Sequence, residues 1–289
     1  MAAKKTVLIT GCSQGTLGDA LAQAFHSRGL RVIATARNTA KTVHLQALGM
    51  DVLSLDVQSS DSIASCVSKV SAMTDGRLDI LINNSGGGYN MPLADASMQK
   101  GKELFDLNVW SVLATCQAFL PLLLKAKGII VNHSSVTSIL PLPTNGLYNA
   151  SKAAVSVMTD TLRLELEPFG VRVIDMKTGS VKSTFFDNVN QGITPKLPKD
   201  SIYYPAREQV ERVMSGETFQ DAMPADAWAR LVVADVLKSQ PPGQIWRGTN
   251  AWLIWFGRRF MPFYYFDSML SKLSGMDVLR KRLAGQAKS

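Results

Sequence analysis

Short apolar runs alternate with longer segments of helical periodicity along most of the chain. The runs are rich in β-branched residues, which is typical of buried parallel strands. The segments between them carry apolar residues three and four positions apart, which is typical of helices that cover a sheet. We predict strands over residues 6–10, 31–36, 51–57, 78–83, 128–133, 171–176 and 244–247. We predict helices after Gly18, over residues 60–73 and 97–126, from Tyr148 to about Glu167, and over residues 224–239.

This alternation predicts an α/β fold, a single domain over residues 5–245 built on a Rossmann-type, doubly wound parallel sheet. In such sheets the functional groups lie at the carboxyl ends of the strands. The residues at these predicted ends are Gly11, Arg37, Asp56, Asn84, Ser135 and Gly179. We therefore expect a site along one edge of the sheet.

Glycines directly follow the first predicted strand and lead into the first helix. In this context a glycine turn lets the backbone approach a pyrophosphate, and the helix N-terminus offers free N–H groups and a positive dipole end. A second glycine-rich turn after the fourth strand, with Asn84 and Gly86, would also come close to the cofactor. The residues predicted to bind in the first turn are Gly11, Ser13, Gly15, Leu17 and Gly18.

The second strand ends in Arg37 rather than in an acidic residue. A carboxylate there would bind the ribose hydroxyls of NAD, whereas an arginine accommodates the 2′-phosphate of NADP. The sequence therefore favours NADP(H). Lys41 either adds a second positive charge or is a solvated lysine on a helix face, and Asp56 lies where an adenine amine could be met.

Ser135, Tyr148 and Lys152 form the candidate catalytic group. Lys152 follows Tyr148 by one helical turn and lies on the same face, so its ammonium is expected to lower the pKa of the phenol towards neutrality. Ser135 would hydrogen-bond a substrate oxygen. The three residues predict proton transfer to and from a carbonyl/alcohol pair, and the alternative for Tyr148 and Lys152 is an ordinary surface pair.

Composition narrows the class of protein. With 289 residues, 46% hydrophobic and 19% charged, the chain suits one large domain and excludes a disordered or collagenous protein. The net charge of +8 could attract nucleotide phosphates or an anionic membrane, but no nucleic-acid motif is present and we expect no nucleic-acid partner. Three widely spaced cysteines suggest neither disulfides nor a metal site, which favours a reducing, cytoplasmic location.

Taken in order, these motifs resemble the short-chain dehydrogenase/reductase family over residues 5 to about 240. The resemblance implies NAD(P)-dependent oxidoreduction by direct hydride transfer without a metal, and a homodimer or homotetramer. It implies that Tyr148 is the general acid in ketone reduction, while Lys152 lowers its pKa and holds the nicotinamide ribose. Ser135 would polarise the carbonyl. Asn108 would hold a water in a proton relay, although as an interior helix residue it is explained equally well by local bonding.

Two features depart from the family pattern. Gly15 and Gly18 are separated by two residues instead of one, so either the turn is longer or Thr16 replaces a glycine. Thr178-Gly179 stands where the family has Pro-Gly. Both changes look similar to a fungal branch of NADPH-dependent 1-acyldihydroxyacetone-phosphate reductases, which also includes ketoreductases of fungal secondary metabolism.

Two segments are expected to decide the substrate. Residues 180–225 lack a sustained period and contain four prolines, which predicts a substrate lid. Val181, with Ser183 or Thr184, would contact the carboxamide of the nicotinamide. Residues 246–289 form an extension rich in aromatic residues. It would be packed as a substrate wall, rest on a membrane at the endoplasmic reticulum or a lipid droplet, or bind a partner.

The sequence thus predicts an NADPH-dependent reductase that converts an apolar ketone, from lipid or specialised metabolism, to a secondary alcohol. Three alternatives stay open. The enzyme could work in the oxidative direction on the same residues, the chain could be a cofactor-binding scaffold without redox chemistry, or the tail could be the functional part, as a lipid-surface segment.

Overall fold

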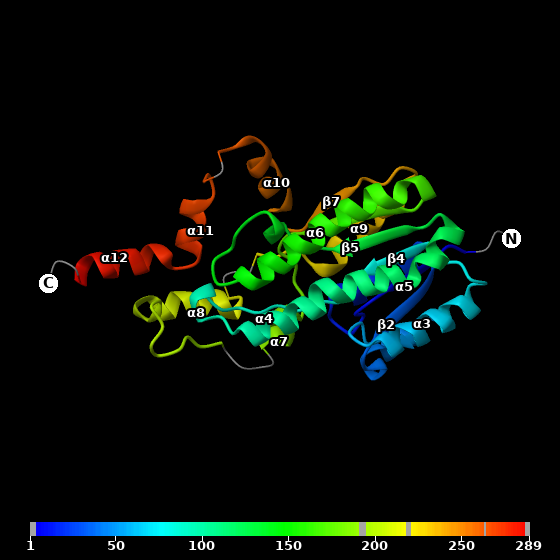
Figure 1. Cartoon of the computed structure of the whole chain (residues 1–289), viewed down its shortest axis with the longest axis horizontal. Coiled ribbons are helices and arrows are strands. Elements are labelled where there is room, and N and C mark those ends of the chain that lie inside the picture. The colour runs from blue at the N-terminus through cyan, green and yellow to red at the C-terminus, as the bar shows by residue number, and fades with distance from the viewer. Residues whose placement is uncertain (1–3, 191–194, 218–220, 263, 287–289) are drawn as a thin grey trace.

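The computed structural model describes residues 4–190, 195–217, 221–262 and 264–286. Within these ranges all strands join one parallel sheet in the order β3-β2-β1-β4-β5-β6-β7 (Figure 1). The predicted Rossmann-type, doubly wound sheet is confirmed, since the order reverses between β1 and β4. The strands are β1 (Thr6–Ile9), β2 (Arg31–Ala36), β3 (Asp51–Ser54), β4 (Ile80–Asn83), β5 (Ile129–His133), β6 (Arg172–Thr178) and β7 (Gln244–Arg247).

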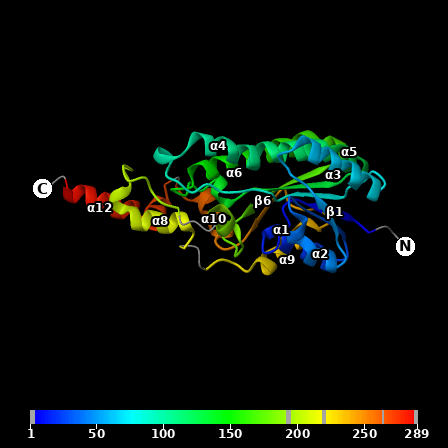
Figure 2. The same ribbon diagram turned by 90° about the horizontal axis from the view of Figure 1, so that it is seen from below.

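Helices cover both faces of the sheet (Figure 2). One face carries α1 (Leu17–Ser27), the short α2 (Val43–Ala47) and α9 (Ala225–Val236). The other carries α3 (Ser60–Met73), α4 (Met98–Phe105), α5 (Ser111–Ala126) and α6 (Gly146–Leu166). The core therefore consists of two apolar layers, one on each side of the sheet.

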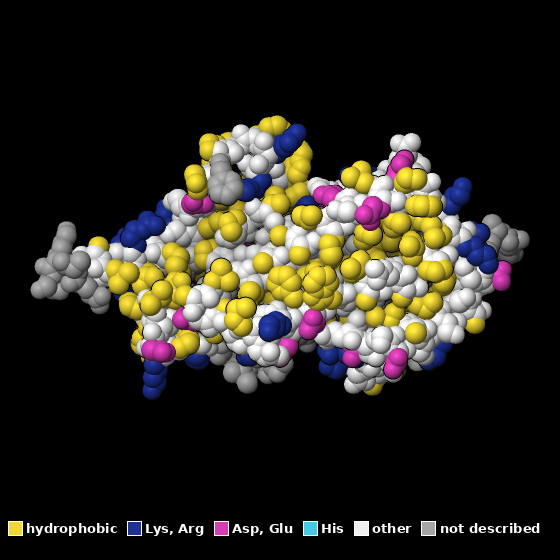
Figure 3. All heavy atoms as spheres, viewed as in Figure 1, with side chains coloured by type: hydrophobic (Ala, Val, Ile, Leu, Met, Phe, Trp, Pro, Cys, Tyr) yellow, Lys and Arg dark blue, Asp and Glu magenta, His cyan; other side chains and the backbone are white. Residues whose placement is uncertain are grey.

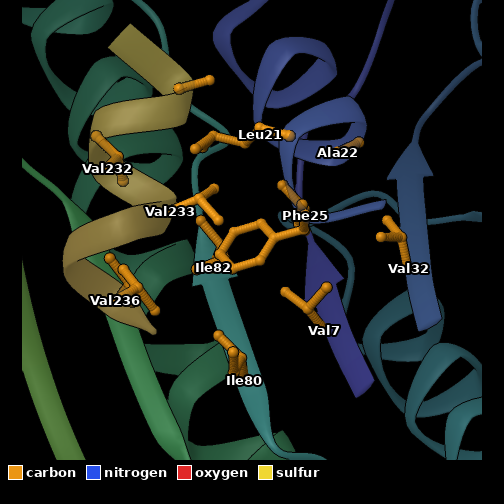
Figure 4. Close-up of a cluster of buried hydrophobic side chains, with 14 of the residues drawn as sticks. Val7, Leu21, Ala22, Phe25, Val32, Ile80, Ile82, Val232, Val233 and Val236 are labelled. Atoms are coloured by element: carbon orange, nitrogen blue, oxygen red, sulfur yellow. The ribbon is translucent and has the colours of Figure 1, made fainter. Parts of the chain in front are cut away.

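The layer under α1 and α9 is built around Phe25. Its fully buried ring lies among Val7, Ile82 and Val233, which come from two strands and the facing helix (Figure 4). The other layer contains Phe119 of α5, also fully buried. Burying two such aromatic rings stabilises the fold by roughly 1.5–3 kcal/mol each relative to leaving them exposed. The strand ends are thereby fixed relative to one another.

The predicted helix over residues 97–126 is one helical stretch with a π-helical turn, Asp106–Trp110, between α4 and α5. Ser97 caps its N-terminus by accepting a hydrogen bond from the N–H of Lys100. By length and composition alone, Met98–Ala126 could cross a membrane, but half of its most apolar window is buried in the protein. It therefore serves as a core helix in this fold.

Two local predictions differ from the structure. The third strand ends at Ser54 instead of residue 57, because the chain turns there: the carbonyl of Asp56 accepts from Ser59 N. The short helix α2 was not predicted, and it forms because Leu45 is drawn into the core beneath β2 and β3.

Beyond the sheet, two segments pack together. The segment after β6, predicted to be irregular, contains α7 (Phe185–Asn190), a 3₁₀ turn (Tyr204–Ala206) and α8 (Arg207–Ser215). The extension after β7 forms α10 (Ala251–Phe260), α11 (Asp267–Leu273) and α12 (Met276–Gln286). Residues of α12 join Val210 and Met214 of α8 in a small apolar cluster, so the end of the chain holds the segment after β6 in place.

Candidate active site

Ser135, Tyr148 and Lys152 come together at the carboxyl end of β5. Ser135 is the second residue after the strand, and the other two lie on the first turns of α6. The Nζ of Lys152 is 5.8 Å from the centroid of the Tyr148 ring, which confirms that the two share a helix face. The hydroxyl of Ser135 accepts from the N–H of Thr137 at 3.1 Å, and its influence on the pKa of Tyr148 places it near the phenol. The predicted group is therefore assembled.

The predicted pKa of Tyr148 is wrong for the protein chain itself. Burial raises the pKa of the phenol to about 12, and the nearby hydroxyl of Ser135 opposes this only in part. Burial dominates because the phenolate loses its hydration in the apolar surroundings, with the ring of Phe185 at 5.8 Å. Tyr148 thus stays protonated at neutral pH, the form that a general acid needs.

Lys152 is held by the strand beside it. Its ammonium donates a hydrogen bond of 2.8 Å to the carbonyl oxygen of His133. Burial lowers the pKa of Lys152 to about 8, while the carboxylate of Asp175 opposes the change. The cation is thereby fixed beside the phenol and becomes sensitive to mildly alkaline pH.

Asn108 lies in the π-helical turn, where a π-bulge turns a side chain out of the normal helical pattern. Its amide oxygen accepts from Gly87 N at 2.8 Å, and its amide nitrogen donates to Gly87 O and to the hydroxyl of Ser151. The side chain ties the second glycine turn to α6, so its bonds are to residues distant in sequence and not the local bonds that the sequence suggested. The role in a water relay stays a prediction.

The first glycine turn contains the unusual spacing before Gly18. Thr16 has a negative φ of −85° and caps α1, accepting from Asp19 N, so a threonine fits here without strain. Gly11 and Gly15 have φ of 75° and 79°, which only glycine adopts without strain. Ser13 and Leu17, the other predicted binding residues of this turn, flank Thr16: Ser13 O accepts from Thr16 Oγ1, and Leu17 opens α1.

Gly18 and Asn84 join the two glycine turns. A Cβ at Gly18 would overlap Gly11 O and lie 2.6 Å from Asn84 Nδ2. The amide of Asn84 donates to Thr10 O at 2.9 Å, and its oxygen is 3.0 Å from His133 Nδ1. The side chain of Asn84 therefore holds β1, β4 and β5 in register. Gly86, in the same turn, lies beside Lys152 and has no side chain that would contact it.

Arg37, Lys41 and Asp56 lie further along the same edge. Arg37 is exposed directly after β2. The carbonyl of Lys41 accepts from the N–H of Gln14, so the exposed Lys41 belongs to a loop that is bonded to the glycine turn. Asp56 is half-buried in the turn after β3. Their roles towards a nucleotide stay predictions.

The segment after β6 lies over the glycine turn. Thr184 N donates to Gly15 O at 3.2 Å, and the Thr184 methyl would lie 2.9 Å from a Cβ at Gly15. Ser183 instead accepts from the N–H of Phe185, and Val181 packs against the core beside Met223. Of the two residues left open by the sequence, Thr184 contacts the turn, through its backbone N–H and its methyl group. The contact with the carboxamide stays a prediction.

His133, half-buried at the end of β5, is a residue that the sequence pattern did not mark. Its Nδ1 is 3.0 Å from Asn84 Oδ1 and its Nε2 is 2.7 Å from Thr178 Oγ1, while its ring stacks on Trp228. Burial lowers its pKa to about 3, so the ring is neutral and Nδ1 donates to the amide oxygen. The only signal for this role was a histidine at the end of an apolar strand.

A second missed feature is the buried pair of Asp175 and Lys177 on β6. The two charged groups are 2.6 Å apart and almost fully buried. The carboxylate also accepts from the hydroxyls of Ser134 and Ser156. Two charges at alternate positions of an apolar strand were the available signal, because alternate residues of a strand point to the same face.

The residues along this edge fit a nicotinamide dinucleotide. The glycine turn at the N-terminus of α1 supplies backbone N–H groups for a pyrophosphate. A Cβ at Gly86 would come within 3.1 Å of Asn108 Oδ1 and would also lie near Lys152. Because glycine has no Cβ, the space beside Lys152 is not filled by a side chain from this turn. Ser135 and Tyr148 lie further along the edge, at β5, which is separated from β1 by β4. The edge thus offers a phosphate site and, beside it, proton-transfer groups.

Comparison with known proteins agrees with this geometry. A family model described as short chain dehydrogenase matches residues 5–194. A short-chain dehydrogenase/reductase of Pestalotiopsis microspora is 49% identical over 98% of both chains. An NADPH-dependent 1-acyldihydroxyacetone phosphate reductase of Schizosaccharomyces pombe is 38% identical over 86% of this chain and 87% of its own. A short-chain dehydrogenase of Streptomyces avermitilis has the same fold, with a TM-score of 0.75 and 23% identity over 97% of this chain and 98% of its own. The chain belongs to the short-chain dehydrogenase/reductase family of oxidoreductases.

Proposed function

We propose that the protein is an NADPH-dependent reductase that converts an apolar ketone to a secondary alcohol. The observation that carries the proposal is Tyr148, protonated at neutral pH, near the hydroxyl of Ser135 and beside the ammonium of Lys152. A carbonyl oxygen held by Ser135 would lie within reach of the phenolic proton. The group therefore supports delivery of a proton to an oxygen that gains negative charge.

Each residue has a separate part in the proposed reaction. The bound cofactor supplies a hydride to the carbonyl carbon. Ser135 holds the carbonyl oxygen, and Tyr148 Oη donates its proton to that oxygen. Lys152 stabilises the negative charge that Tyr148 then carries, because its ammonium is fixed nearby in a low-dielectric site.

An apolar substrate is supported by the aromatic residues next to Tyr148. Phe185 of α7 lies 5.8 Å from the Tyr148 ring, and Phe186 packs edge-on against Phe185. Aromatic rings beside a catalytic group favour apolar ligands. The relative named as an acyldihydroxyacetone phosphate reductase supports a lipid ketone, and ketones of fungal secondary metabolism are the other proposed class.

The first test is binding followed by turnover. Nicotinamide fluorescence would be followed during titration with NADPH and with NADH, and a panel containing an acyl-dihydroxyacetone phosphate and several apolar aromatic ketones would then be added. We expect tight NADPH binding and oxidation of NADPH by one of these classes. Binding without turnover of any ketone would support a scaffold instead. Alcohol oxidation much faster than ketone reduction would support the oxidative alternative.

Replacing Arg37 by aspartate is expected to reverse the cofactor preference. Loss of a charge-assisted contact with the 2′-phosphate, worth about 1.5–3 kcal/mol, should weaken NADPH binding by at least about tenfold. NADH binding should change little. Dissociation constants for both nucleotides measure this, with Arg28→Asp as the control, because Arg28 is exposed at the opposite end of α1. Equal losses for both nucleotides would show that Arg37 does not bind the phosphate.

The pH profile should report Lys152. Its pKa of about 8 means that the ammonium is present below that pH and lost above it. Ketone reduction needs the charged form, so kcat/KM for NADPH should be constant below about pH 7 and fall about tenfold per pH unit well above 8. Tyr148, with a pKa of about 12, stays protonated across this range. A profile that is flat from pH 6 to 10 would contradict the role of Lys152.

We also propose that the protein works as a homo-oligomer. Large apolar side chains are exposed on the faces of the π-helical turn and α6: Trp110, Val157 and Leu164 are 55%, 68% and 65% exposed. Apolar side chains gather on this face in Figure 3. Such patches support subunit contacts, and sedimentation velocity measures the assembled mass.

A further inference from the structure

The outer face of α10 is the most unusual surface of the described chain. A helix that only packs on a domain buries its large apolar residues. In α10 the buried positions are Ala251, Ile254 and the small Gly257. By contrast, Trp252 is 65% exposed and Phe260 is 62% exposed. The large aromatic residues of this helix thus point away from the protein.

These exposed residues form one continuous surface. At 100° per residue the outer positions of α10 fall on an arc of about 160°. They are the exposed Trp252, Leu253, Trp255, Arg259 and Phe260, with the half-buried Phe256 among them. The chain continues this surface with Met261, Tyr264 and Tyr265, which are 39%, 72% and 54% exposed. We call these nine residues the aromatic patch; apolar and basic side chains lie together on α10 in Figure 3.

The rings of the aromatic patch pack against one another. Trp252 stacks on Phe256 with centroids 5.4 Å apart, and Phe256 lies 5.0 Å from Phe260. Trp255 meets Phe260 edge-on at 6.1 Å. The result is a broad surface of neighbouring rings on the outer face of a helix. A peptide that binds in a groove would need a concave surface, whereas this surface fits a planar apolar boundary.

Charge distinguishes between the possible occupants. Residues 251–286 contain six Lys/Arg and two Asp/Glu, a surplus of four out of the net +8 of the whole chain. Arg259 is exposed on the same arc as the rings. A second copy of this chain would bring the same positive surplus to the contact, whereas anionic headgroups would complement it. Tryptophan and tyrosine with adjacent arginine are typical of the membrane interface.

We propose that the aromatic patch binds the surface of a bilayer that contains anionic lipids, with the rings among the headgroups and Arg259 paired with lipid phosphate or carboxylate. The protein would lie on the membrane and not cross it. The inner face of α10 packs against Val136, Leu140 and Leu142, in the segment that follows Ser135. The bilayer contact is thus one helix away from the catalytic group.

Vesicle binding tests this with the full-length protein. Flotation would be measured with phosphatidylcholine vesicles with and without phosphatidylserine. The double variant Trp252→Ser/Phe260→Ser should bind at least about tenfold more weakly to both, because the two most exposed rings of α10 are lost. The control is Phe169→Ser, since Phe169 is 61% exposed on the turn after α6 and matches Phe260 in exposure. It should bind like the wild type.

The charge contribution is tested separately. Arg259→Gln should weaken binding about fivefold on vesicles with phosphatidylserine and leave binding to neutral vesicles unchanged, as expected for one surface cation. NADPH binding and Tm should stay at wild-type values in these variants, because the changed side chains are exposed. The proposal is overturned if the wild type does not float, or if the double variant floats as well as the wild type. A lower assembled mass of the double variant in sedimentation would also overturn it, since the patch would then be a subunit contact.

Discussion

Tyr148→Phe is expected to reduce the rate of ketone reduction by a factor of about 10² to 10⁴ while NADPH still binds. The variant loses only the phenolic hydroxyl, so the packing against Phe185 and the position of Lys152 are kept. Without the proton of Tyr148, the oxygen that Ser135 holds would have to take its proton from water. The loss should therefore appear in kcat and not in the dissociation constant of NADPH.

Single-turnover oxidation of NADPH by the substrate ketone measures this effect. Tyr203→Phe is a suitable control, because Tyr203 also loses a hydroxyl but packs in the cluster around Leu197 and Val210. It should retain wild-type turnover. If Tyr148→Phe reduced the ketone at the wild-type rate, another group would be the acid. The oxidation of the corresponding alcohol should fall by a similar factor, because the same proton is then removed by the same oxygen.

The second large effect is expected on stability. Asp175→Asn leaves the ammonium of Lys177 buried beside a neutral amide, and breaking a buried ion pair in this way costs about 3–5 kcal/mol. For a chain of this size that corresponds to a fall in Tm on the order of 10 °C. The loss is large because both groups are almost fully buried, with side chains 0% and 3% exposed.

Calorimetry of two further variants defines the cause. Asp226→Asn removes a partner of the exposed pair with Arg230, whose side chains are 67% and 64% exposed, and should leave Tm unchanged. The double variant Asp175→Leu/Lys177→Met removes both charges and should recover most of the stability, since no charge is then left unpaired. A wild-type Tm for Asp175→Asn alone would show that the pair contributes nothing to folding.

Most of the sheet could be predicted from the sequence because buried parallel strands are marked by short β-branched runs between helices. The predicted strand over 31–36 and the predicted helix over 60–73 agree with β2 and α3 at both ends. Ser59 caps this helix by accepting from Ser62 N. The helices of the extension were not predicted, because their pattern of exposed aromatic residues is the reverse of an ordinary packed helix.

The catalytic group was predictable for a related reason. Parallel strands place all their carboxyl ends at one edge, so residues such as Gly11 and Ser135 meet whatever their separation along the chain. The one-turn spacing of Tyr148 and Lys152 adds a contact that a helix enforces locally. His133 was missed because its partners, Asn84 and Thr178, come from other strands and no local pattern joins them.

By itself the sequence determined the family, the presence of one functional edge on a parallel sheet, and the residues on that edge. Each of these depends on local periodicity and on the fixed geometry of parallel sheets. Only the tertiary structure decided how those residues behave. It raised the pKa of Tyr148, lowered that of Lys152 and brought Thr184 rather than Ser183 to the glycine turn. It also turned the rings of α10 outward. Burial and hydrogen bonding at these positions come from segments distant in sequence, and these are the terms that set a pKa and an exposed surface.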